Sequence, residues 1–131
     1  ITMLESGITD NVDDAVALKA AGVDGIQVSS HGARQLESAP APITVLPQIR
    51  AALGSSFPLF YDSGLRSGED VLKAISQGAD FTFFGRALQF AIAAAGESGL
   101  HQLWDVLSDE LSIAMAQTGV CHIRGDNNQI C

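Results

Sequence analysis

Residues 22–37 read GVDGIQVSSHGARQLE, and the apolar run at their start decides the fold. Residues 25–29 (GIQVS) are short, mostly apolar and followed at once by a serine, a histidine and a glycine. Residues 58–62 (PLFYD) and 81–85 (FTFFG) have the same character, and residues 2–5 (TMLE) are a weaker candidate. Such runs are typical of strands buried on both faces of a parallel sheet.

Helix-length patterns separate and follow these runs. They cover residues 11–21, 43–53, 67–77, 87–95 and 100–118. The stretch 67–77 has acidic residues in its first turn, where the helix dipole favours them. The last stretch carries an apolar stripe that we expect to pack in the core, made of Leu103, Trp104, Leu107, Leu111 and Met115.

Alternating strands and helices predict an α/β protein with a parallel sheet. Two architectures remain open, a doubly wound sheet and a (β/α)₈ barrel, and in both the functional loops follow the carboxyl ends of the strands. The chain has about four βα units, which is half a barrel. With 131 residues it is one domain or part of one, and because it starts inside a strand pattern we expect residues 1–131 to be a fragment.

Composition excludes some partners. The formal net charge of −8 argues against binding nucleic acid or an anionic membrane surface. No apolar run is long enough to span a membrane, and the start lacks a secretion-signal pattern. Cys121 and Cys131 show neither metal-ligand spacing nor a disulfide framework, so we expect no metal and a reducing, cytoplasmic location.

Three of the five arginines follow the three clear strands: Arg34, Arg66 and Arg86. In a barrel all three converge on one face, where planar guanidinium groups bind a phosphate or a carboxylate. The alternative is that each arginine pairs with a local acid, and the candidates are Glu37, Asp62 and Glu69.

Two of these loops have the composition of a phosphate site. Gly85 and Arg86 lead directly into a predicted helix, whose first N–H groups are free to bind an anion. Residues 62–68 (DSGLRSG) similarly offer Ser63, Gly64 and Arg66 before a helix start. Asp62 would not contact a phosphate and could instead cap a helix or orient another side chain.

His31 is the residue best suited to proton transfer, because the unperturbed pKa of histidine lies near neutrality. It follows a strand, precedes Gly32 and lies three residues before Arg34. His101 and His122 have no such setting, and we interpret both as surface or packing residues.

Three blocks together resemble one known family. Residues 29–37 (SSHGARQLE) are similar to the S-N-H-G-[GA]-R-Q-L-D signature of the FMN-dependent α-hydroxy acid oxidases and dehydrogenases, which include glycolate oxidase, lactate oxidase and L-lactate dehydrogenase. Residues 62–68 resemble the family's D-G-G-[IV]-R-x-G, and residues 83–87 its F-[IVF]-G-R-P. The blocks agree in order and distance, and the resemblance runs from about residue 7 to residue 120.

The resemblance implies a (β/α)₈ barrel with FMN at its mouth, of which this chain would supply units five to eight. It implies oxidation of a small L-2-hydroxy acid, such as lactate or glycolate, to the 2-oxo acid. By resemblance His31 takes the proton and Arg34 holds the substrate carboxylate. The residues around the FMN ribityl chain and phosphate are then Asp62, Ser63, Gly64, Arg66, Gly85 and Arg86. The resemblance also implies an N-terminal barrel half as partner and a homo-oligomer, by family habit a tetramer.

Four departures from the family pattern matter. Gly7 stands where the family has a lysine near the flavin, Ser30 where it has asparagine, Ser63 where it has glycine and Ala87 where it has proline. The missing lysine would lower the flavin potential and weaken FMN retention. Two alternatives therefore stay open: a catalytically inert phosphate-binding or assembly module, and another FMN or phosphate-binding barrel. If the chain is half of an oxidoreductase barrel, its open edge and exposed half-core mean that it is not expected to turn over alone.

Overall fold

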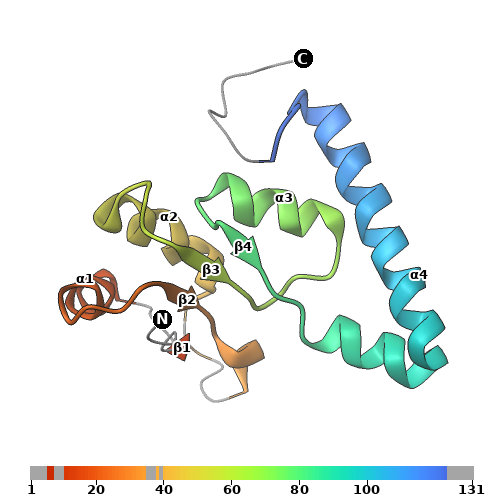
Figure 1. The fold of residues 1–131 in the computed structure, drawn as a ribbon, viewed down its shortest axis with the longest axis horizontal. Coiled ribbons are helices and arrows are strands. Elements are labelled where there is room, and N and C mark those ends of the chain that lie inside the picture. Colours follow the sequence, from red (N-terminus) through yellow and green to blue (C-terminus); the bar gives the residue numbers. More distant parts are fainter. Residues whose placement is uncertain (1–5, 8–10, 35–37, 39, 124–131) are drawn as a thin grey trace.

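The computed structural model describes residues 6–7, 11–34, 38 and 40–123. Its sheet has four parallel strands in the order β1-β2-β3-β4 (Figure 1). The strands are β1 (Ser6–Gly7), β2 (Ile26–Val28), β3 (Leu59–Tyr61) and β4 (Phe81–Thr82). The α/β class and the parallel sheet are thus confirmed. Residues 2–5, the weaker strand candidate, lie outside the described residues.

Helices follow the strands as the sequence pattern predicts. They are α1 (Val12–Ala20), α2 (Pro42–Leu53), α3 (Gly68–Ser76) and α4 (Arg86–Thr118), with a short 3₁₀ turn η1 (His31–Ala33) after β2. The patterns at 87–95 and 100–118 join into the single element α4. A kink at Ala95 and Gly96 interrupts it, where Gly96 adopts φ 58° and ψ −135°. Glycine tolerates that backbone conformation, which explains why the chain bends there.

The core lies between the sheet and the first three helices. From the strands it takes Ile26, Val28, Leu59 and Tyr61, each at most 3% exposed. From the helices it takes Ala15, Val45, Leu46, Ile49, Leu53 and Ala74. Because side chains alternate along a strand, one face of the sheet is thereby covered.

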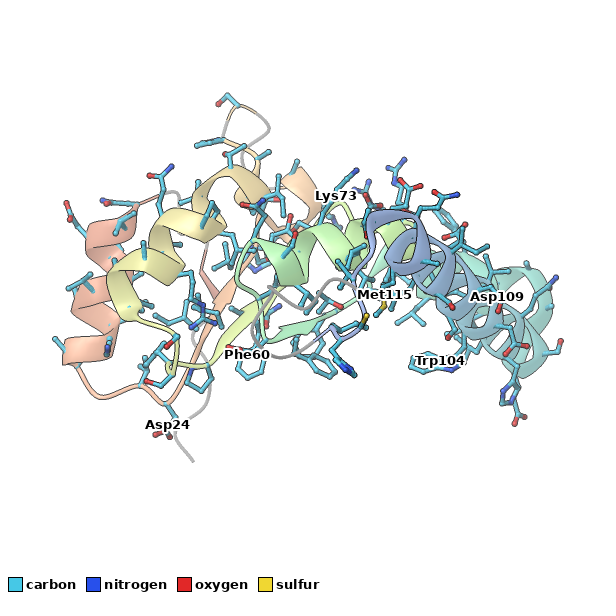
Figure 2. The ribbon with its side chains drawn as sticks, turned by 90° about the horizontal axis from the view of Figure 1, so that it is seen from above. Asp24, Phe60, Lys73, Trp104, Asp109 and Met115 are labelled. Carbon is cyan, nitrogen blue, oxygen red and sulfur yellow. The ribbon has the colours of Figure 1, made fainter. Side chains whose placement is uncertain are left out.

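The opposite face of the sheet carries aromatic side chains that remain open. Gln27, Phe60 and Phe81 are register partners, so their side chains share that face. Figure 2 shows Phe60 pointing away from α2 and α3. Phe81 is 49% exposed, and Phe83, whose tilted ring lies 5.1 Å from it between centroids, is 41% exposed. A large apolar surface of this kind marks a place where another segment packs.

One expectation from the sequence was wrong. Trp104 does not pack in the core, because its side chain is 72% exposed (Figure 2), although Leu103, Leu107, Leu111 and Met115 of the same stripe are partly buried. The cytoplasmic location stays a prediction, because Cys131, one of the two cysteines behind it, lies outside the described residues. None of the described helices has the length and apolar character needed to cross a membrane.

Candidate functional site

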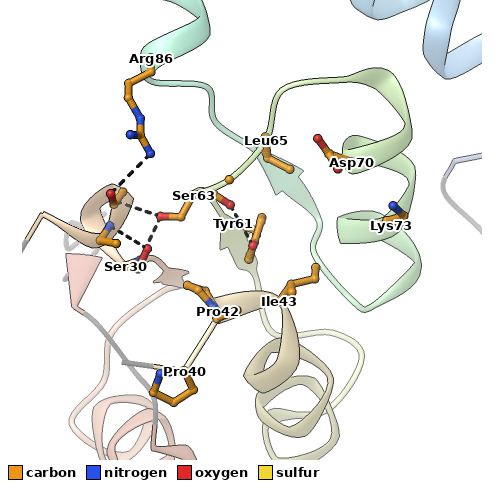
Figure 3. Close-up of a pocket in the computed structure, with 14 residues that line it drawn as sticks. Ser30, Pro40, Pro42, Ile43, Tyr61, Ser63, Leu65, Asp70, Lys73 and Arg86 are labelled. Carbon is orange, nitrogen blue, oxygen red and sulfur yellow. Dashed lines mark hydrogen bonds between the residues drawn. The ribbon is translucent and has the colours of Figure 1, made fainter. Parts of the chain in front are cut away.

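The structure brings all eight predicted site residues to one cleft. The cleft has a volume of about 660 Å³ and lies at the carboxyl ends of β2, β3 and β4. Its lining includes His31, Arg34, Asp62, Ser63, Gly64, Arg66, Gly85 and Arg86. A second hollow of about 500 Å³ shares Gly32, Ser63, Gly64 and Arg86 with it (Figure 3).

His31 begins a left-handed turn directly after β2. Its φ is 50°, and Gly32 and Ala33 follow with φ 66° and 61°. Non-glycine residues rarely adopt this conformation, so two of the three positions carry backbone strain. The N–H of Ala33 donates to the carbonyl oxygen and to the hydroxyl of Ser30, at 2.9 and 3.3 Å. His31 and Arg34 are both exposed at the cleft, at the two ends of this turn.

Asp62 connects β2 to the loop after β3. Its Oδ1 accepts from the hydroxyls of Ser29 and Ser63, each at 2.6 Å, and its Oδ2 accepts from the Gln27 amide. The carboxylate therefore orients other side chains, which is one of the two roles that the sequence left open. It makes no ion pair with a described arginine.

Ser63 links that carboxylate to the His31 turn. While its hydroxyl donates to Asp62, it accepts from the N–H groups of Ser30 at 3.0 Å and Gly32 at 3.4 Å (Figure 3). Ser29 acts in parallel, accepting from the N–H of His31 at 3.0 Å. The sequence analysis missed Ser29 and Gln27, and the signal was available: both are polar residues inside or directly after an otherwise apolar strand.

The charges of the three arginines at the cleft are not neutralised by a described acidic side chain. Within the described part of the chain, Arg34, Arg66 and Arg86 make no ion pair. Arg86 instead places Nη2 3.5 Å from the carbonyl oxygen of Gly32. Glu37, one proposed acidic partner, lies outside the described residues. Three exposed guanidinium groups around one cleft favour an anionic ligand.

Only one of the two helix starts is open to such a ligand. Gly85 precedes α4 without any side-chain cap, and a Cβ built on it meets no atom within 4 Å. At α3, in contrast, Ser67 and Asp70 form a capping box, and the N–H of Gly68 donates to the Glu110 carboxylate at 2.8 Å. The N–H groups of Gly68 and Asp70 are therefore already bonded, and the expected contribution of the α3 start to an anion site stays a prediction.

Tyr61 supports the floor of the second hollow. Burial, with smaller contributions from Asp62 and Asp70, raises the pKa of its phenol to about 12. The hydroxyl donates to the carbonyl oxygen of Ser63 at 3.0 Å. Tyr61 is thus a neutral donor that holds the β3 loop. Among the described residues no group of His, Cys, Asp and Glu could hold a metal ion.

A family model described as FMN-dependent dehydrogenase matches residues 7–130. The chain belongs to this family. Among curated members, an L-lactate oxidase of Alicycliphilus denitrificans is 43% identical over 111 residues, which are 85% of this chain and 30% of that protein. The 2-hydroxyacid oxidase 1 of Mus musculus is 44% identical, over 86% of this chain and 30% of its own length. The peroxisomal (S)-2-hydroxyacid oxidase GLO4 of Arabidopsis thaliana is 41% identical, over 90% and 35%.

Solved structures of the family have the same fold over this chain. An oxidized active mutant of (S)-mandelate dehydrogenase superposes with a TM-score of 0.86 and 38% identity, over 92% of this chain and 33% of that one. A lactate oxidase of Pediococcus acidilactici gives the same TM-score, identity and coverage. The chain therefore spans about a third of the length of the family members that it matches.

Proposed function

We propose that this chain is the C-terminal half of an FMN-binding (β/α)₈ barrel, contributing units five to eight. The strand order supports this, because four consecutive parallel strands with helices on one face have the geometry of half a barrel. The open face with Phe60, Phe81 and Phe83 then belongs to the barrel interior, and the N-terminal half covers it. The edges of β1 and β4 pair with strands of that half, and the isolated chain is inactive.

The proposed activity is oxidation of a small L-2-hydroxy acid to the 2-oxo acid. One observation carries it: a histidine and three arginines, which make no ion pair with any described residue, line a single cleft at the carboxyl ends of parallel strands. A 2-hydroxy acid offers what this set can bind, an anionic carboxylate beside a hydroxyl that must lose a proton. Relatives named lactate oxidase and 2-hydroxyacid oxidase support the same substrate class.

The residues at the cleft fit FMN. The uncapped start of α4, the open space at Gly85 and the guanidinium of Arg86 suit the phosphate, and Arg66 adds a second cation. Gly64 also leaves open space at its Cβ, so the backbone can approach the ribityl chain. A cleft of about 660 Å³ lies in the usual range for cofactor sites. When bound, FMN supplies the acceptor for the two electrons of the substrate.

The chain's own residues supply position and proton transfer. The Arg34 guanidinium holds the substrate carboxylate, so that the reacting carbon has one orientation in the cleft. The imidazole of His31 accepts the hydroxyl proton as the C–H bond is broken. Both residues lie on one short turn, and a single backbone element therefore sets the distance between the base and the carboxylate anchor. The assembled protein is proposed to be a homo-oligomer, as the family resemblance implies.

Gly7 favours a second candidate, a catalytically inert phosphate-binding or assembly module. It is the last residue of β1 and lies at the carboxyl end of the strands, as the His31 turn does. The resemblance places a lysine at this position. Without that charge, FMN could bind at its phosphate and yet not be reduced. The third reading, a different FMN or phosphate-binding barrel, is disfavoured by the family match.

Anaerobic flavin absorbance separates these candidates. The assembled protein is loaded with FMN and mixed with L-lactate or glycolate, while the oxidised flavin band near roughly 450 nm, set by the cofactor, is followed. Bleaching that is lost in His31→Ala while FMN stays bound supports the oxidase. His101→Ala is the matched control and should bleach like wild type. Bound FMN that no 2-hydroxy acid bleaches supports the inert module.

A further inference from the structure

The N–H groups of three consecutive residues in the His31 turn all donate to two serine hydroxyls. Ser63 accepts from Ser30 and Gly32, and Ser29 accepts from His31. Both hydroxyls donate their single proton to the same oxygen of Asp62, Oδ1, at 2.6 Å. The direction of every bond is thereby fixed, because a hydroxyl that donates to a carboxylate offers only lone pairs to the turn.

Ser63 occupies a backbone conformation that favours glycine. Its φ is 83°, and a side chain in this region carries strain that glycine avoids. Gly64, the next residue, also has positive φ, at 80°. A glycine at position 63 would therefore suit the backbone better, yet it would leave the Ser30 and Gly32 N–H groups without this acceptor. The contacts of the hydroxyl give the strained serine a physical reason.

We propose that Ser63 is a positioning residue: its hydroxyl, oriented by Asp62, fixes the left-handed turn that presents His31 to the substrate. Ser29 is the second half of the same clamp. The bonds of Ser63 flank His31 on both sides, whereas Arg34 lies beyond the turn, so the loss of the hydroxyl displaces the imidazole more than the carboxylate anchor. The proposal rests on the proposed function for its catalytic consequence, but its structural part is independent of it.

Amide hydrogen exchange tests the structural part residue by residue. In the assembled, FMN-loaded protein, Ser63→Gly should speed exchange at Ser30 and Gly32 by roughly tenfold and leave His31 less affected. Ser29→Ala should give the reverse pattern. Ser63→Ala, which keeps the strain and lacks the hydroxyl, should match Ser63→Gly. Ser56→Gly, in the exposed turn before β3, is the control. Unchanged exchange at Ser30 and Gly32 in Ser63→Gly overturns the proposal, whether or not the protein oxidises hydroxy acids.

Kinetics tests the positioning role. Ser63→Gly should lower kcat by roughly tenfold or more, since small displacements of a reacting group cost that much, while KM changes less than twofold. Its unfolding midpoint should stay equal to wild type or rise, because strain is relieved. A purely structural serine would show a fall in stability together with unchanged kcat in the folded protein, and that result overturns the role. Failure of the proposed function is separate, since wild-type protein would then never bleach its flavin.

Discussion

The guanidinium of Arg86, at the first position of α4, lies 3.5 Å from the carbonyl oxygen of Gly32, 54 residues earlier in the chain. The contact joins the loop after β4 to the turn after β2 across the mouth of the sheet (Figure 3). It leaves most of the guanidinium donors without a protein partner among the described residues. The same side chain can therefore tie the two loops together and bind an anion at the start of α4.

Replacement of Arg86 should weaken FMN binding. Arg86→Ala removes a cation from the proposed phosphate site, and we expect the Kd for FMN to rise at least tenfold, with a partial loss in Arg86→Lys. Flavin fluorescence quenching in titrations of the assembled protein measures this. Lys19→Ala, an equal charge change on α1 outside both hollows, is the control and should bind like wild type. An Arg86→Ala protein that keeps wild-type affinity contradicts the phosphate assignment.

Replacement of Arg50 should lower the free energy of unfolding, because its side chain joins α2 to several loops. Its guanidinium pairs with Asp80 at 2.6 Å, and Asp80 also accepts from the N–H of Leu59 at 2.8 Å. The Arg50 guanidinium also donates to three carbonyl oxygens, those of Gly54, Phe57 and Gly78. Arg50→Met leaves the carbonyls and a carboxylate without this partner, and we expect a loss of about 2 kcal/mol of unfolding free energy.

Urea unfolding of the assembled protein checks the Arg50 prediction. Gln48→Met, on the exposed side of the same helix, is the control and should change stability by less than about 0.5 kcal/mol. Specific activity of the folded protein should stay the same in both variants, because Arg50 does not line the cleft. A loss of activity without a loss of stability would contradict this purely structural role.

Gly68 should tolerate no side chain. A Cβ there would lie 2.1 Å from the Leu111 backbone nitrogen and 2.6 Å from the Leu107 carbonyl oxygen, so α3 and α4 would have to separate. We expect Gly68→Ala to lower the free energy of unfolding by about 3 kcal/mol or more, as overpacking against backbone does, and a strong fall of the thermal midpoint measures this. Gly22→Ala is a useful comparison, because its φ is 91° but the space around it is empty. It should show only backbone strain, about 1 kcal/mol.

Tyr61 predicts how stability depends on alkaline pH. Its folded pKa of about 12 lies above the unfolded value of 10.0, so the folded state holds the phenol proton more tightly. The contribution of this pKa difference to the free energy of unfolding is fully present below pH 10 and is lost as pH rises from 10 to 12. In Tyr61→Phe this part of the decline should disappear, although the variant starts lower by the lost hydrogen bond to Ser63. Urea midpoints of both proteins at several pH values measure the difference, and parallel curves would contradict the assignment.

Much of the architecture was predictable because the decisive signals are local. Three short apolar runs placed β2, β3 and β4 within three residues, since a strand buried by helices has nearly continuous apolar sequence. The position of the cleft followed from a rule for parallel sheets, that loops at the carboxyl ends of strands meet. The arginines and His31 could therefore be assigned to one edge before any coordinates were known.

What the sequence did not reveal depends on contacts between distant residues. The role of Asp62 required the register that places it beside Gln27 and Ser29. The capped start of α3 required Glu110 of α4, 42 residues away. Trp104 sits at the border of an apolar stripe, and a helical period alone cannot tell the border of a stripe from its centre. Local patterns carry no information on such pairings.

Gly7→Lys is the substitution that most directly tests the flavin site. Gly7 ends β1 and pairs with Val28, at the sheet edge that bears the His31 turn. A lysine there would place a cation beside the proposed flavin ring, where it stabilises the negative charge of the reduced form. We expect a several-fold lower Kd for FMN, a higher flavin potential and faster bleaching by L-lactate. Ala51→Lys, on an exposed position of α2, makes the same charge change away from the cleft and should leave all three values unchanged. If Gly7→Lys leaves the affinity and the potential as they are, the flavin ring does not lie beside β1, and the inert module with only a phosphate site becomes the better account of this chain.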